Sequence, residues 1–384
     1  MSAPSWKYRK KMNYAKDQRS NITAAIDLQS LVQRWAPLVF LAPGEKFYPS
    51  DVSEFLDHVI AIPEKDTSST VYENGEFTAE AREDASDDLP KGRLSESWYL
   101  TTRQEVETLL RNSSSFIYGR NPEKYSVPVY ALIEVCQPEI EGNFTLRRID
   151  SPRIHFHVTY WMFYPFSQGK SLCTFDMGRF GAWPIPKLNN QCLGNIKEYG
   201  NHVGDWEHVS LYFEDSEYPK RMYVSTHDVG AFYRYSKVSD RFEFEKREIR
   251  KGILQRPAFP SVMKLAAPGQ RPVLFSARGS HGLWTAPGRH KFVRLPRLHD
   301  DSGFGVPWMT WKNIHMLKAH SRTPRNWLKF RGKWGNQKSR CHPVSRLGIN
   351  ICEISDGPTG IPLKKMNFRC SAHTAKSRDS RRSN

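Results

Sequence analysis

Apolar and polar residues alternate through most of the chain between positions 127 and 277, which is the pattern of half-buried β-strands. Segments rich in Gly, Pro and Asn separate the alternating runs, and almost no helical period intervenes. The runs lie at 127–136, 153–164, 207–213, 221–226, 231–235, 242–249 and 272–277. We therefore predict a mainly-β fold, an antiparallel β-sandwich with long functional loops and a few short helices.

The segments around these strands predict the remaining elements. Residues 31–41 have the composition of a strand, although Pro37 lies within them. Short helices are predicted at 51–59, with Asp51 and Glu54 as capping box, and at 102–112, with Thr102 as cap. The connections at 165–206 and 278–320 exceed hairpin lengths, and their Gly, Pro and Trp content predicts packed, functional loops.

The net charge of +17 is concentrated at the two ends of the chain. Residues 1–19 hold six basic and one acidic side chain, and residues 312–384 hold seventeen basic and three acidic. The body between them is close to neutral, so we expect no specific nucleic-acid binding. The basic ends are expected to contact acidic partners or an anionic membrane surface.

The domain organisation follows from the same composition. We predict a basic N-terminal arm at 1–25, one β-sandwich domain at 26–365 with an acidic insertion at 64–96, and a basic tail at 366–384. No apolar run reaches the roughly 18 residues that cross a bilayer, and no signal-peptide pattern is visible. We expect a cytoplasmic location, with association to a vacuole or membrane.

Six cysteines contain no C-x-x-C spacing, which argues against a structural zinc site. Cys136 lies in an apolar strand pattern and is expected to be an inert buried thiol. Cys341 and Cys352 bracket a loop and form the favoured pair if the compartment is oxidising.

The densest chemistry lies at 201–208, in the sequence NHVGDWEH. Asp205 and Glu207 are two residues apart on a strand, so both project to the face of Val209, Leu211 and Phe213. Ionised carboxylates removed from water need a compensating charge.

Two interpretations of this pair remain open. One is a divalent-cation site for magnesium or calcium, held by Asp205 and Glu207 with His202 as a third ligand. The other is a strand end at which Asp205 caps the loop and Glu207 pairs with an arginine.

Two further groups are candidate ligand-binding residues. His155, His157 and Trp161 share one strand face and are expected beside the carboxylates, unless they are core residues. Arg278, Ser280 and His281 follow a strand in a glycine-flanked loop, where an arginine can bind an anion. A Ser–His hydrolase is excluded because Ser280 and His281 are adjacent and no G-x-S-x-G elbow occurs.

Several blocks together resemble the vacuolar protein sorting-associated protein 62 family. They are 35–39 (WAPLV), 45–50 (EKFYPS), 160–161 (YW), 200–208 (GNHVGDWEH), 276–282 (SARGSHG), 331–336 (RGKWGN) and 357–360 (GPTG). The resemblance covers most of residues 30–365. It implies a role in protein delivery to the vacuole and assigns no reaction.

The motif at 201–208 alone is also similar to the G-H-R-H-D-W-E heptapeptide of necrosis- and ethylene-inducing peptide-like proteins. His202, Asp205, Trp206 and Glu207 match it, and Gly204 stands at the second histidine. A G-S-H element of those toxins resembles residues 279–281. This similarity implies a divalent cation and a glycosylated lipid head group.

We therefore expect a non-enzymatic protein of vacuolar sorting type. Asp205 and Glu207 would hold the cation, His202 would orient it, and Arg278 with His281 would contact an anionic or glycosylated head group. The alternatives are a membrane-acting, cytolysin-like toxin and a metal-assisted hydrolase in which Glu207 or His281 is the general base.

Overall fold

The structure is a computed structural model. It describes residues 27–64, 72–73, 76–77, 89, 98–136, 155–186, 188–189, 191–250, 256–266, 271–293, 298–318, 326–343 and 351–370. The predicted basic arm at 1–25, most of the acidic insertion and the tail beyond residue 370 lie outside these residues.

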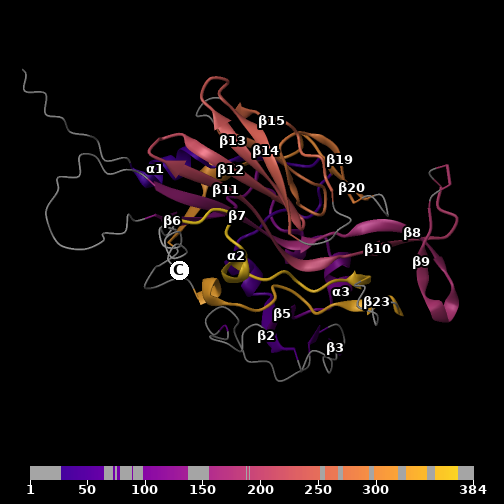
Figure 1. Cartoon of the computed structure of the whole chain (residues 1–384). Coiled ribbons are helices and arrows are strands. Elements are labelled where there is room, and N and C mark those ends of the chain that lie inside the picture. The colour runs from indigo at the N-terminus through magenta and orange to yellow at the C-terminus, as the bar shows by residue number, and fades with distance from the viewer. Residues whose placement is uncertain are drawn as a thin grey trace, which may run out of the picture.

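An eight-stranded sheet forms the centre of the molecule, in the order β15-β14-β13-β12-β11-β7-β6-β22 (Figure 1). Its strands are β6 (Val129–Val135), β7 (His155–Ser167), β11 (His202–Glu214), β12 (Pro219–Thr226), β13 (Val229–Ser236), β14 (Arg241–Ile249), β15 (Val262–Met263) and β22 (Ile314–Lys318). The alternation seen in the sequence places every second side chain of β7 up to Tyr164, and of β11 from Asp205 onward, on the same face.

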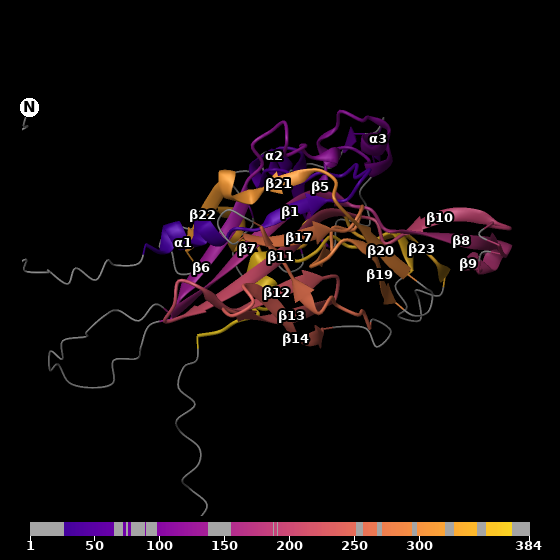
Figure 2. The same cartoon turned by 90° about the horizontal axis from the view of Figure 1, so that it is seen from above.

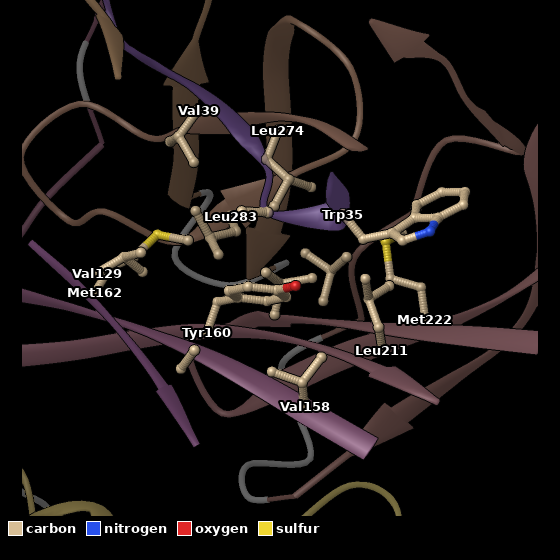
Figure 3. Close-up of a cluster of buried hydrophobic side chains, with 14 of the residues drawn as sticks. Trp35, Val39, Val129, Val158, Tyr160, Met162, Leu211, Met222, Leu274 and Leu283 are labelled. Carbon is tan, nitrogen blue, oxygen red and sulfur yellow. The ribbon is translucent and has the colours of Figure 1, made fainter. Parts of the chain in front are cut away.

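A smaller sheet packs on one face of the first (Figure 2). It contains β16 (Leu265–Ala266), β17 (Arg271–Ser276), β1 (Leu38–Leu41) and β21 (Pro307–Met309), with β18 (Leu283–Trp284) beside β17. The hydrophobic cluster between the two sheets is the first core. Figure 3 shows Val39, Leu274 and Leu283 facing Val158 and Tyr160 of the large sheet across it. The predicted β-sandwich is confirmed, although β1 with β17 and β6 with β22 pair in parallel.

The opposite face of the large sheet is also buried. Trp161, Phe163 and Trp206 form a second core with Trp327 and Trp334 from the C-terminal region. The covering elements are α2 (Val52–Leu56), α3 (Val106–Arg111), η3 (Phe116–Tyr118), β2 (Val59–Pro63), β5 (Trp98–Thr102), η6 (Asn326–Lys329) and η8 (Ile361–Leu363). The central strands therefore lie between two apolar layers.

The N-terminal elements differ in part from the sequence prediction. The strand at 31–41 was wrong in its first half, which is the helix α1 (Leu28–Trp35), capped by Asp27 and burying Leu31, Val32 and Trp35 at helical spacing. The helix at 51–59 exists but ends at Leu56. Thr102 does not begin a helix, because it ends β5 and α3 starts only at Val106.

The two long connections contain strands and are not loops as predicted. Residues 165–206 include β8 (Lys170–Asp176), η4 (Gly178–Phe180), β9 (Ala182–Pro184) and β10 (Asn195–Tyr199), which form a three-stranded sheet. Residues 278–320 include β18, β19 (Gly288–Val293), β20 (Leu298–Ser302), β21, η5 (Thr310–Lys312) and β22. Two further pairs are β3 (Tyr72–Glu73) with β4 (Glu76–Phe77) and β23 (Ser339–Cys341) with β24 (Cys352–Ile354). Gly and Pro interrupt the alternation of these short strands, which hid them in the sequence.

All six cysteines form disulfides, in the pairs Cys136–Cys370, Cys173–Cys192 and Cys341–Cys352. The predicted pairing of Cys341 with Cys352 is confirmed. The expectation of a free thiol at Cys136 was wrong, because the segment before residue 371 returns to the sheet, where Phe368 is buried. In the described part of the chain, no helix is long and apolar enough to span a membrane.

Candidate functional site

The strand β11 positions the two carboxylates as its alternation predicted. Asp205 lies opposite Tyr164 and Glu207 opposite Met162 of β7, and both partners belong to the first core. Asp205 and Glu207 are 7% and 6% exposed. Two acidic side chains thus stand at the end of an apolar face.

Gly204 makes this placement possible. Its φ of +67° is in the left-handed region, and a Cβ at this position would lie 2.1 Å from the carbonyl oxygen of Trp334. The backbone turns there between Val203, which packs in the second core, and Asp205, which faces the first. A histidine at position 204, as in the toxin heptapeptide, does not fit this backbone.

A cavity of about 290 Å³ opens beside the carboxylates. It is lined by Ser167, His202, Asp205, Trp206, Glu207, His208, Ser225, His227, Asp228, Arg250, Ser280, Phe292, Asp356, Pro358 and Lys364. The structure thus brings His202, Asp205, Glu207 and Ser280 of the predicted site together. It adds Arg250 and Lys364, which sequence reasoning missed because they are distant in the chain and carry no motif.

Asp205 is fixed by His281. The Nδ1 of His281 lies 3.1 Å from the Asp205 carboxylate, and its Nε2 lies 3.1 Å from the carbonyl oxygen of Phe47. Both ring nitrogens face oxygen atoms, so the imidazole is held on both sides. Burial raises the pKa of Asp205, but the hydrogen bond from His281 and nearby positive charge, including that of Lys364, outweigh burial, so the pKa lies below its usual value.

Glu207 has the opposite environment. No hydrogen bond reaches its carboxylate from any described residue, and its Oε2 is buried. Burial raises the pKa of Glu207 well above its usual value, and the negative charge of Asp205 adds to the shift. Glu207 is therefore a buried acid without a hydrogen bond from the described residues, and the positive charges of Lys364 and Arg250 lower its pKa only in part.

Among the described residues, His202 has a hydrogen bond at one ring nitrogen only. Its Nδ1 lies 2.7 Å from the carbonyl oxygen of Gly204 and donates to it, which leaves the Nε2 lone pair available. Burial lowers the pKa of His202, which favours the neutral ring. A neutral histidine held by a backbone carbonyl is the usual form of a metal-ligating imidazole.

The other predicted ligand residues lie away from the cavity. His155 and His157 stand at the far end of β7, opposite Glu214 and Tyr212, and Trp161 packs in the second core against His208. The side chain of Arg278 is 55% exposed, 3.6 Å from the carboxylate of Asp301, and does not line the cavity. Ser280 lines the cavity but donates its hydroxyl to Asp300 at 2.9 Å.

Within the described residues, one group brings three metal-capable donor atoms within 4.8 Å of one another. It consists of Glu134, His157 and Cys370 at the far end of the sheet, and the sulfur of Cys370 is bonded to Cys136. The donor atoms of His202, Asp205 and Glu207 are farther apart than this limit.

Asp300 forms a second charged cluster behind the cavity, which sequence reasoning also missed. It is fully buried and accepts hydrogen bonds from Lys170 (2.8 Å), His227 (2.7 Å), Ser280 (2.9 Å) and Trp284 (3.1 Å). Burial raises the pKa of Asp300, but His227 and Lys170 lower it far more. Its partners come from three separate segments, around Lys170, around His227 and at 280–284, so spacing in the sequence gives no signal for them.

Comparison with known proteins gives two relatives. "Putative vacuolar protein sorting-associated protein TDA6" of Saccharomyces cerevisiae is 26% identical over 374 residues, which cover 91% of this chain and 69% of that protein. "Vacuolar protein sorting-associated protein 62" of the same yeast is 24% identical over 351 residues, 86% of this chain and 64% of that protein. No protein-family model and no solved structure matches the chain.

These alignments run through nearly all of the motif blocks found in the sequence. They do not bear on the similarity to the toxins, which rests on the motif at 201–208 alone. The resemblance over most of the chain is confirmed: the chain is related to the vacuolar protein sorting-associated protein 62 family.

Proposed function

We propose that the protein acts in vacuolar protein sorting and that its cavity binds a divalent cation together with an anionic or glycosylated head group. The names of both relatives support the sorting role. The chain spans 69% and 64% of those two proteins, so the role is proposed for the part that aligns.

The observation that carries the cation site is the unpartnered carboxyl of Glu207 beside the ionised carboxylate of Asp205. A bound cation relieves both the repulsion between the two acids and the cost of burying them. Oxygen ligands favour magnesium or calcium, with the free Nε2 of His202 as a further ligand. Binding draws Glu207 toward Asp205, and no hydrogen bond from a described residue holds Glu207 back.

The anionic part of the ligand is assigned to Arg250 and Lys364, in place of Arg278. Arg250 donates to Ser225 and to the carbonyl oxygens of His227 and Val229, while its Nε is buried without a partner. Within the described residues, no carboxylate lies within 4.0 Å of the Lys364 ammonium. A phosphate, sulfate or carboxylate group would satisfy both cations.

A binding role is favoured over catalysis by the hydrogen bonds of the obvious candidates. His281 is held at both nitrogens and is fully buried, so it is not free to act as a base. Ser280 donates to Asp300 and not to a histidine. Neither forms the nucleophile–base pair of a hydrolase.

One observation favours metal-assisted hydrolysis as a second candidate function. The environments of Asp205 and Glu207 move their pKa values in opposite directions, which is the arrangement that separates an acid from a base. Glu207 would then be the proton-transferring group. Metal-dependent turnover in a panel of ester, phosphate and glycoside substrates, lost in Glu207→Gln, tests this alternative.

The three disulfides bear on the compartment. Such bonds persist in oxidising compartments and are rare in the cytosol. They favour a lumenal location over the cytoplasmic one expected from the sequence. Thiol alkylation of the protein in intact cells tests this, since cytosolic protein would show six modified cysteines and lumenal protein none.

Isothermal titration with magnesium and calcium chloride tests the cation site. The parent is expected to bind one of the two ions, and Asp205→Asn and Glu207→Gln are each expected to weaken binding by about tenfold or more. Glu243→Gln, a half-exposed carboxylate on β14, is the matched control and is expected to bind as the parent does. Absence of binding by the parent, or equal binding by all four proteins, would contradict the proposal.

A further inference from the structure

The three-stranded sheet of β8, β9 and β10 projects from the body as a finger, seen at the right of Figures 1 and 2. The disulfide Cys173–Cys192 joins its first strand to the segment before β10. The chain enters the finger after Ser167 and leaves it before His202, and both of these residues line the cavity. The finger therefore begins at the cavity wall.

The finger carries an unusual concentration of exposed apolar side chains. Of the fourteen large hydrophobic residues that are exposed in the described chain, seven lie between 175 and 196. They are Phe175, Met177, Phe180, Trp183, Leu188, Leu193 and Ile196. Soluble surfaces rarely gather apolar side chains in this way without a binding partner.

The strand register gives the finger two different faces. Trp183 lies opposite Phe175, and Ile196 opposite Cys173, so these side chains share one face. Asp176 and Asn195 lie on the other face and are exposed, while Thr174 between them is buried. Such an element has one side suited to an apolar medium and one side suited to water.

The kind of apolar residue and the nearby charge indicate lipid as that medium. Tryptophan is enriched at the membrane–water interface, and phenylalanine and leucine are common on the apolar face of elements that lie in it. The guanidinium of Arg179 at the turn lies 5.0 Å from the ring centre of Phe180. Arg340 on β23 is already paired with Glu107 at 2.8 Å, so Arg179 is the cation that supports this interpretation. Exposed cations beside interfacial aromatic rings complement anionic lipid head groups.

We infer that the finger docks the protein on an anionic lipid bilayer, with Phe175, Trp183 and Ile196 in the interfacial layer. The inference rests on the proposed function, because docking would bring the proposed head-group site to a membrane. The finger and the cavity nevertheless use different residues. The two are therefore tested by different variants.

Flotation with vesicles of phosphatidylcholine, alone or mixed with phosphatidylserine, tests the docking. The parent is expected to float with the mixed vesicles, and the triple variant Phe175→Ser, Trp183→Ser, Ile196→Ser is expected to bind at least about tenfold more weakly, because three apolar side chains no longer leave water. The matched control is Val238→Ser with Ile249→Ser, which removes exposed apolar residues elsewhere on the body and should bind as the parent does.

Unchanged thermal unfolding of the triple variant shows that its fold is intact, since all three positions are exposed. Equal flotation of parent and triple variant would overturn the inference, and so would failure of the parent to bind either kind of vesicle. A parent that dimerises through the finger and ignores lipid would show that a second copy occupies this face, which also overturns it. Glu207→Gln is expected to float as the parent does while losing the heat of cation binding, so the docking and the cation site fail separately.

Discussion

Two buried carboxylates near one cavity have opposite environments. Asp300 is fully buried and accepts four hydrogen bonds, two of them from Lys170 and His227. Glu207 is 6% exposed and accepts none from the described residues. Asp300 has hydrogen-bonded, charged partners, whereas Glu207 has only the more distant charges of Lys364 and Arg250 and no hydrogen bond from the described residues.

The difference separates a structural role from a functional one. A protein gains stability from a satisfied buried charge only through its partners, so Asp300 joins the segments around the cavity into one unit. An unsatisfied buried acid costs stability in the free protein and persists where a ligand supplies what is missing. We interpret Glu207 as such a site.

Removing Asp300 tests the structural side of the comparison and should have the largest effect. Asp300→Ala leaves Lys170 and His227 without their buried partner, so we expect a loss of about 3–5 kcal/mol in the free energy of unfolding. Urea unfolding measures it. The control is Asp301→Ala, at the exposed neighbouring residue. Equally small losses in the two variants would contradict the structural role of Asp300.

The backbone that places Glu207 can be broken at Gly204. Gly204→Ala puts a Cβ on a left-handed backbone and presses it against the carbonyl oxygen of Trp334. We expect a loss of about 2–4 kcal/mol in the free energy of unfolding. Gly200→Ala is the control, because its φ is +86° but nothing lies within 4 Å of its added Cβ. It should cost only about 1 kcal/mol, and equal losses would show that the contact with Trp334 is unimportant.

Glu207→Gln should act in the opposite direction to Asp300→Ala. Because the pKa of Glu207 is raised in the folded state, ionisation costs stability as the pH rises from the unfolded value toward the folded one. The variant is expected to be about 1–2 kcal/mol more stable than the parent near pH 7, and the gain should vanish near pH 4. Denaturant unfolding at both pH values measures it, and a destabilised variant near pH 7 would contradict the account.

His208 gives a smaller effect on the acid side. Burial lowers its pKa well below the usual value, and Asn367 lies 2.8 Å from its Nε2 as a donor. The contribution of neutral His208 to the free energy of unfolding is therefore complete above the unfolded pKa of about 6.5. It is lost as the pH falls below that value, because the unfolded chain then binds a proton that the folded protein does not. Relative to His208→Gln, the parent should lose about 1 kcal/mol between pH 7 and pH 5.5, and parallel pH profiles would rule out this origin.

The sequence predicted the part of the site that lies within one strand. The period of two placed Asp205 and Glu207 on one face, and the structure confirms that face. The same rule placed His157 and Trp161 on a common face. It could not say which end of the strand meets the cavity, because that depends on the pairing between β7 and β11. Strand alternation fixes faces and leaves register open.

The remainder of the site depends on contacts across long stretches of the chain. Asp300 meets Lys170 and His227, which lie 130 and 73 residues away, and no local pattern signals these contacts. Gly204 could be seen as a departure from the toxin motif, but its reason is the carbonyl oxygen of Trp334. The helix at 28–35 was missed because its last apolar residue, Trp35, continues directly into the apolar residues around Pro37, and no glycine separates the helix from the strand.

The protonation of Glu207 tests the central claim most directly. Carboxyl-labelled glutamate in the whole protein, with the Glu207 signal assigned by its loss in Glu207→Gln, allows its pKa to be followed by NMR with and without magnesium or calcium. The account predicts a pKa well above the usual value of 4.5 in the free protein and a clear fall when the ion is added. An ordinary pKa that neither ion changes would contradict it.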